Sequence, residues 1–153
     1  MEISSDKEQA GPSGILIDRQ IEILCQTYSQ EVLAGTTRVV NLLGRKCEPQ
    51  ILYTFLGFEL KMSRKRLTCP DMSTACYLKI FAEIGMAVIR IPYDPTHTSR
   101  LLPKLEQPLH QIKEILLRKK LDKLDHQSEL RRIYQRIRKR FEVAEQVTQN
   151  PKL

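Results

Sequence analysis

The chain has 153 residues, of which 41% are hydrophobic and 28% are charged, and its 25 Lys and Arg against 18 Asp and Glu give a net charge of +7. This composition supports a hydrophobic core and excludes wholesale disorder. No apolar run approaches the ~20 residues that a membrane-spanning helix needs, and the polar start MEISSDKEQAGPSG lacks the basic and apolar blocks of a signal peptide. We therefore expect a cytoplasmic protein of one ordinary domain, without a membrane span.

The first third of the chain predicts a disordered tail over residues 1–14, followed by a long helix from Asp18 to about Leu43. Apolar side chains recur there at steps of three and four residues, as on one face of a helix: Ile17, Ile21, Leu24, Tyr28, Val32, Val39 and Leu43. Asp18 is a suitable N-cap, and Gly44 can end the helix in a left-handed turn. The pattern weakens near Gly35.

Residues 48–69 predict a short helix and then two short strands. Glu48-Pro49 can open a helix through about Leu56, because proline suits the first helical turn. From Phe58 to Met62 apolar and charged residues alternate, which is the period of a half-buried strand. The loop SRKR follows, and Leu67-Thr68-Cys69 can form a second strand. One continuous helix from Pro49 to Met62 is the alternative.

The stretch CPDMSTACYLKIFAEIGMAVIRIPYD predicts a capped helix that turns directly into a strand. Pro70 and Asp71 suit a helix N-terminus, and Gly85 suits the position after the last turn. The β-branched residues 87–91 predict the strand, which Pro92 ends. Pro95, Thr96 and Thr98 indicate a loop.

The chain after Pro103 predicts helices, with a kink or restart at Pro108. Two blocks with 4-3 spacing differ in phase, and the slip between them predicts a helix break at 125–128. The blocks are Leu117, Leu121 and Leu124, then Leu130, Tyr134, Ile137, Phe141 and Ala144. We therefore expect an α+β, mainly helical fold: a mostly helical core at 15–100 with short strands, a C-terminal helical arm at 101–147 and a tail at 148–153.

The arm carries the entire excess charge of the chain. Between residues 118 and 140 there are ten basic side chains and only three acidic ones. The basic residues are Arg118, Lys119, Lys120, Lys123, Arg131, Arg132, Arg136, Arg138, Lys139 and Arg140. Such a concentration attracts polyanions, and a solvated helical face whose apolar stripe packs on the body is the alternative interpretation.

The sequence offers little for catalysis or for cofactor binding. It contains none of the metal, nucleophile or phosphate-loop motifs HExxH, GxSxG, GxxxxGK[ST] and GxGxxG. Its four cysteines, Cys25, Cys47, Cys69 and Cys76, include no CxxC pair, so we interpret them as small buried side chains. A lowered thiol pKa at Cys69 or Cys76, near a helix N-terminus, is the alternative. We expect a non-enzymatic protein without a cofactor or metal.

The stretch STACYLKIFAEIGMAVIRIPYD resembles the recognition helix and wing strand of a winged helix-turn-helix domain, over about residues 48–98. The resemblance implies that the helix from Asp71 lies in the major groove, and that Arg90 and the loop from Asp94 to Arg100 form the wing. The residues nearest the bases would then be Ser73, Thr74, Tyr77 and Lys79. However, this helix is apolar almost all round and has no arginine, which is typical of a helix packed on two sides.

Two functions fit these observations. The first is nucleic-acid binding, most simply of DNA, with phosphate contacts from the arm and from Arg64, Lys65 and Arg66 in the SRKR loop. An acidic partner other than nucleic acid is the alternative for these contacts. For the SRKR loop alone, an ordinary solvated loop is the simpler interpretation. The second is a small scaffold or regulatory module that pairs with another protein, or with itself as a homodimer, through the C-terminal helix. The seam for that pairing would consist of Leu130, Tyr134, Ile137 and Phe141.

Overall fold

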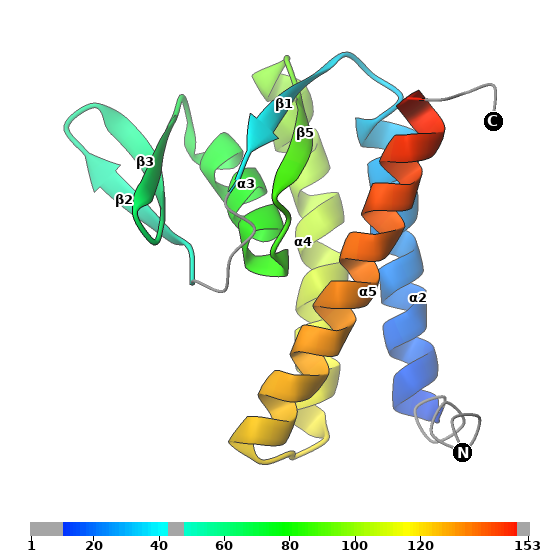
Figure 1. Ribbon diagram of the computed structural model, residues 1–153. Helices are drawn as coiled ribbons and strands as arrows, with labels where there is room; N and C mark the ends of the chain where they lie inside the picture. Colours follow the sequence, from blue (N-terminus) through cyan, green and yellow to red (C-terminus); the bar gives the residue numbers. More distant parts are fainter. Residues whose placement is uncertain (1–10, 43–47, 150–153) are drawn as a thin grey trace.

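A computed structural model describes residues 11–42 and 48–149 of the chain (Figure 1). It confirms an α+β, mainly helical fold with two small antiparallel sheets. Three long helices lie side by side as rods, and they are α2 (Pro12–Thr27), α4 (Pro95–Arg118) and α5 (Lys123–Gln149) (Figure 1). Helix α3 (Met72–Ile84) lies between these rods and the three-stranded sheet (Figure 1).

The N-terminal helix is shorter than predicted and starts earlier. Helix α2 spans Pro12–Thr27 and continues into the π-helix η1 at Tyr28–Val32. Residues 12–14, predicted as tail, are therefore helical, and Asp18 lies inside α2 instead of capping it. The second half of the predicted helix is wrong, because β1 occupies Thr37–Asn41. Residues 1–10, Leu43 and Gly44 lie outside the described residues.

Three strands follow where a helix and two strands were predicted. Strand β2 spans Gln50–Thr54, β3 spans Gly57–Met62 and β4 spans Lys65–Cys69, and they form one antiparallel sheet in the order β2-β3-β4. The two strands predicted here are confirmed, whereas the helix at 48–56 and the continuous helix to Met62 are both wrong. Ile51 pairs with Leu60 and Tyr53 with Phe58, so each apolar pair covers the same face of the sheet.

The predicted helix–strand corner is confirmed. Helix α3 spans Met72–Ile84, and the Asp71 carboxylate accepts a hydrogen bond of 2.7 Å from the backbone N–H of Thr74. Gly85 follows the last turn at φ +94°, in the left-handed region. Strand β5, Val88–Pro92, then pairs antiparallel with β1. The caps that the sequence offers at both ends of α3 therefore determine its length.

We expect Gly85→Ala to lower the free energy of unfolding by about 1–2 kcal/mol, since an L side chain is strained at this φ. A Cβ at Gly85 would also lie 2.9 Å from Nη1 of Arg138. Urea denaturation followed by circular dichroism measures the change. Gly35→Ala is the matched control, because its Cβ would meet only ordinary contacts at 3.8 Å or more; an equal loss in both variants would contradict the prediction.

The C-terminal half forms two long helices with one turn between them. Helix α4 spans Pro95–Arg118 and α5 spans Lys123–Gln149. The predicted loop at 94–100 is wrong, because Asp94 caps α4 through the N–H of Thr96 at 2.9 Å and Pro95 occupies its first turn. Helix α4 continues through Pro103 and Pro108 without a restart. The break lies at 119–122, earlier than the predicted 125–128.

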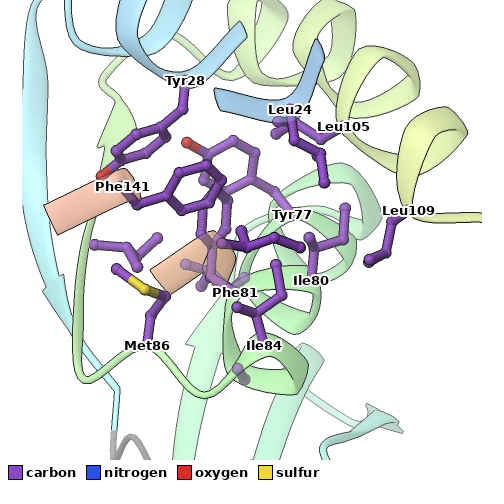
Figure 2. Packing of buried hydrophobic residues seen from close by; sticks show 14 of the residues in the cluster. Leu24, Tyr28, Tyr77, Ile80, Phe81, Ile84, Met86, Leu105, Leu109 and Phe141 are labelled. Carbon is purple, nitrogen blue, oxygen red and sulfur yellow. The ribbon is translucent and has the colours of Figure 1, made fainter. Parts of the chain in front are cut away.

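One hydrophobic core joins α2, η1, α3, β5, α4 and α5. Figure 2 shows Tyr28, Tyr77, Phe81 and Phe141 packed together near its centre. The Tyr28 and Phe141 rings stack with centroids 4.4 Å apart, and Tyr77 and Phe81 lie at 4.9 Å. The C-terminal helices are therefore part of the domain core, and α5 is not an appended arm.

Candidate nucleic-acid interface

The turn between α4 and α5 gathers four basic side chains at one end of the molecule. Arg118 ends α4, Lys119 caps it, and Lys120 takes a left-handed conformation with φ +55°. The Asp122 carboxylate then accepts a 2.8 Å hydrogen bond from the N–H of Asp125 in the first turn of α5. Arg118, Lys119, Lys120 and Lys123 are all exposed. The tight turn thus places these cations close together in solvent.

Helix α5 presents further cations on the face opposite the core. Ile133, Ile137 and Phe141 are buried. At 100° per residue, Arg132 and Lys139 lie on the opposite side, and both are exposed. They stand two turns apart, about 10 Å along the axis. Arg131 is exposed on the other flank of α5, where it lines a groove together with Lys79 and Lys113.

Four of the ten arm cations bind groups within the protein: Arg136, Arg140 and Lys119 pair with carboxylates, and Arg138 binds a backbone oxygen. Arg136 pairs with Asp18 at 2.5 Å and Arg140 with Glu22 at 2.7 Å, so two steps of four residues match along α2 and α5. The Glu22 hydrogen bond raises the pKa of Arg140. Lys119 pairs with Glu129 at 3.2 Å. These exposed pairs fix helix positions and contribute little stability, about 0–1 kcal/mol each.

Arg138 has a different role from the other arm residues. Its guanidinium donates a 2.6 Å hydrogen bond to the backbone oxygen of Ile84, at the C-terminus of α3. A cation there satisfies a free carbonyl and complements the negative end of the helix dipole. Arg138 therefore links α5 to α3, and its side chain is only partly exposed.

The remaining six arm cations are exposed on α4, on α5 and in the turn between them, and we call them together the basic surface. Across residues 11–42 and 48–149, none of the six takes part in a salt bridge or side-chain hydrogen bond. They are Arg118, Lys120, Lys123, Arg131, Arg132 and Lys139. An open groove of about 600 Å³ lies between α2 and α5. Its lining includes the basic residues Lys119, Arg132, Arg136 and Lys139 and the acidic residues Asp18 and Glu129.

The second predicted phosphate clamp lies elsewhere. Arg64, Lys65 and Arg66 are at the β3–β4 turn, and the three-stranded sheet lies on the opposite side of α3 from α5 (Figure 1). Lys65 donates a 2.7 Å hydrogen bond to the backbone oxygen of Asn41, and Arg66 approaches Glu59 at 3.6 Å. The structure therefore does not join this turn and the basic surface into one interface.

Helix α3 does not present the base contacts that the winged-helix resemblance implies. Thr74 and Tyr77 are buried, and the Tyr77 hydroxyl donates a 2.8 Å hydrogen bond to the backbone oxygen of Arg90. Ser73 bonds to Ser99, and Lys79 is half-buried between α3 and α4. The helix at 48–56 and the wing loop at 94–100, on which the resemblance also depends, are a strand and a helix.

Arg90 is also turned inward. The guanidinium of Arg90 pairs with Glu145 of α5 at 3.5 Å, and the backbone N–H of Arg90 donates a hydrogen bond to the Tyr28 hydroxyl. Burial raises the pKa of Tyr28 and that of Glu145. Arg90 therefore belongs to a half-buried polar network between β5, η1 and α5, and in this conformation its guanidinium is paired within the protein.

The predicted seam for a partner helix is occupied within the chain. Tyr134, Ile137 and Phe141 are buried against α2, α3 and α4, and Leu130 packs against the same core. The Tyr134 hydroxyl donates a 2.7 Å hydrogen bond to Glu83, which also pairs with Lys113. Burial raises the pKa of Tyr134 above its usual range. Helix pairing through this seam, including a homodimer, would require α5 to leave the domain.

The sequence-based prediction missed the acidic partners of the arm. Asp18 and Glu22 stand four residues apart on α2, as Arg136 and Arg140 do on α5. This equal spacing was the available signal, but it becomes meaningful only when α2 and α5 are known to lie side by side. Glu83 and Lys113 were likewise absent from the predicted site residues.

The three cysteines in the described ranges do not have the lowered pKa of a reactive thiol. Burial raises the pKa of Cys69 and of Cys76, which overturns the lowered pKa suggested by their place near a helix N-terminus, and it raises the pKa of Cys25 to about 11. Cys47 lies outside the described residues. Among the residues with described positions, no three His, Cys, Asp or Glu side chains gather in a way that could hold a metal ion.

Comparison with protein-family models, with curated proteins and with solved structures gave no match. None of the helices in the described ranges combines the length and apolar character that crossing a bilayer requires.

Proposed function

We propose that the chain binds duplex nucleic acid, most simply DNA, through phosphate contacts from the basic surface. The observation that carries the proposal is a group of six exposed cations, on α4, on α5 and in the turn between them, that make no ion pair within the described part of the chain. Like charges so close together repel one another unless an anion lies between them. A nucleic-acid backbone supplies such anions at regular spacing.

Contacts of this type recognise the phosphate backbone and not the sequence. Arginine and lysine side chains on a convex helix reach phosphate oxygens, whereas base reading requires polar side chains on an element that enters a groove. Helix α3 is packed into the core and cannot serve as that element in this conformation. The proposed binding is therefore largely independent of sequence.

The distribution of aromatic side chains favours a duplex over a single strand. Proteins that hold single strands stack the bases on exposed aromatic rings. In the described ranges, the large exposed aromatic side chains are Tyr53, Phe55 and Tyr93, on or beside the strands, and none is on α4 or α5. The basic surface thus offers charge without a stacking platform.

A salt titration tests the proposal. If about six phosphates are engaged, affinity for a duplex should fall by about 10³-fold between ~50 and ~200 mM salt, because each contact releases counterions. Fluorescence anisotropy with labelled duplex DNA, duplex RNA and single-stranded DNA measures this. Polyglutamate of matched charge is the comparison polymer. No binding to any nucleic acid at low salt contradicts the proposal, and tighter binding of polyglutamate reassigns the surface to an acidic protein partner.

A further inference from the structure

The hairpin of β2 and β3 carries the most exposed apolar side chains of the described chain. Tyr53 is 83% exposed, Phe55 107% and Leu56 84%. Phe55 and Leu56 form the two-residue turn, and Thr54 stabilises it through a hydrogen bond from its hydroxyl to the Gly57 oxygen at 3.1 Å. The hairpin projects from the side of the molecule away from α5 (Figure 1). A rigid turn thus holds three large side chains in solvent.

The two edges of this sheet differ in charge. Strand β4, at one edge, carries Lys65 and Arg66, and lysines and arginines on an edge discourage pairing with other chains. Strand β2, at the other edge, reads QILYT, and no Asp, Glu, Lys or Arg occurs between Gln50 and Phe58. Among the described residues no further strand pairs with β2. Its free N–H and C=O groups can therefore accept another strand.

A partly apolar groove lies beside β2 on the inner face of the sheet. Its volume is about 520 Å³, and it runs between β2, α3 and α4. Apolar side chains line part of it, chiefly Ile51, Ile80, Pro103 and Leu109. Ile51 and Tyr53 lie on the same face of β2, because they are two residues apart. One molecule thus carries both a projecting apolar edge and a concave surface next to it.

We propose that two copies of the chain pair through β2, antiparallel and about a two-fold axis at Leu52. In this register Tyr53 of one copy lies opposite Ile51 of the other, at the mouth of its groove, and Phe55 lies opposite Pro49. The contact is made twice, as a two-fold interface requires. The two three-stranded sheets become one sheet of six strands, whose outer edges are the charged β4 strands, so the assembly stops at two.

The charge of the chain is compatible with this partner. The excess of +7 lies on residues 118–140, on the other side of α3 from the sheet (Figure 1). Two copies joined at β2 therefore hold their basic surfaces apart, where salt screens their repulsion beyond about 8–10 Å. A lipid surface fits the hairpin less well, because its turn has no basic side chain beside Phe55 and Leu56 to bind anionic headgroups.

The oligomeric state of the full chain tests the proposal. Light scattering after size-exclusion chromatography should give twice the chain mass of 17.8 kDa as the concentration rises toward about 100 μM. Tyr53→Lys should raise the dimer dissociation constant at least tenfold, because it places a charge in each copy of the interface. Tyr93→Lys is the matched control, since Tyr93 is 61% exposed beside the other sheet, and it should leave the dimer unchanged.

A cysteine pair tests the register. Residues directly opposite in antiparallel strands have Cβ atoms about 4.5–5.5 Å apart, close enough for a disulfide after small adjustments. Leu52→Cys should therefore cross-link two copies under mild oxidation, whereas Thr54→Cys should not, since the two Thr54 positions are about 13 Å apart along the strands.

Three outcomes would overturn the proposal. A chain that remains a monomer at about 100 μM excludes self-pairing with a dissociation constant below about that concentration. If that monomer also binds lipid vesicles through Phe55, the hairpin is a membrane-binding element. A dimer that Tyr53→Lys does not weaken is formed by another surface. Equal cross-linking of the Leu52→Cys and Thr54→Cys variants excludes the two-fold register.

Discussion

Replacing Phe141 with alanine should lower the free energy of unfolding by about 3–5 kcal/mol, which is a large part of the stability of a domain of this size. Phe141 is fully buried, and the centroid of its ring lies 4.4 Å from the ring centroid of Tyr28 and 5.7 Å from that of Phe81. The cavity would open where η1, α3 and α5 meet (Figure 2). Urea denaturation followed by circular dichroism measures the change.

Val143→Ala is the matched control for this prediction. Val143 lies on the same helix and is 58% exposed, so its truncation should change stability by less than about 0.5 kcal/mol. The comparison separates a docked α5 from an independent arm. If α5 were not docked, both variants would have similarly small effects, and the description of the C-terminal helix as a core element would be wrong.

Reversing the charge of Arg132 and Lys139 together should weaken binding to duplex DNA by about 100-fold at low salt. Both side chains lie on the solvent face of α5 and make no ion pair with the described residues, so the fold should be unaffected. The slope of log affinity against log salt should also become shallower by about 2, because two phosphate contacts are lost. Anisotropy titrations of Arg132→Glu/Lys139→Glu at several salt concentrations give both quantities.

The matched control changes the net charge equally at a distant place. Arg38 on β1 and Arg100 in the second turn of α4 are both exposed. Arg100 stands about 27 Å along α4 from Arg118, at the opposite end of the helix. Arg38→Glu/Arg100→Glu should keep most of the affinity and the full salt slope. If it weakens binding as much as the α5 variant, total charge governs binding and the basic surface is not the site.

The elements with strong end signals could be predicted from the sequence. Asp71, Gly85 and the β-branched run after it determine α3 and β5 locally, and the structure keeps all three. The same signals were present at Asp94-Pro95, where they begin α4, but neighbouring threonines favoured the interpretation as a loop. Capping residues therefore predict where a helix begins and ends better than the composition of the neighbouring residues does.

Two segments that form strands, β1 and β2, were predicted as helices, because their apolar residues also fit the spacing of a helix. Val39 continues the helical spacing of α2 but belongs to β1, and the change of structure falls near Gly35, where the pattern weakens. The segment after Pro49 was predicted as a helix, yet its Ile, Tyr and Thr residues favour strands. The pairing of β2 with β3 and of β1 with β5 decides these cases, and the spacing of apolar residues within one segment does not reveal either pairing.

The candidate site could be located only in part. The concentration of cations at 118–140 was evident from the sequence, but their division into inward and outward groups was not. Arg136 and Arg140 meet partners 118 residues earlier in the chain. Arg138 reaches a helix end on α3, 54 residues earlier. Only the packing of three separate helices reveals which cations remain for an external partner.

The π-helix at Tyr28–Val32 makes the length of this segment as important as its residues. The N–H of Leu33 bonds to the oxygen of Tyr28, five residues earlier, instead of four as in an α-helix. Deleting one residue here would restore α-helical bonding and rotate everything upstream relative to β1 by about 100°. Tyr28, Val32 and Leu33 are all buried, and they could not then all face the core. The segment should therefore tolerate substitution far better than insertion or deletion.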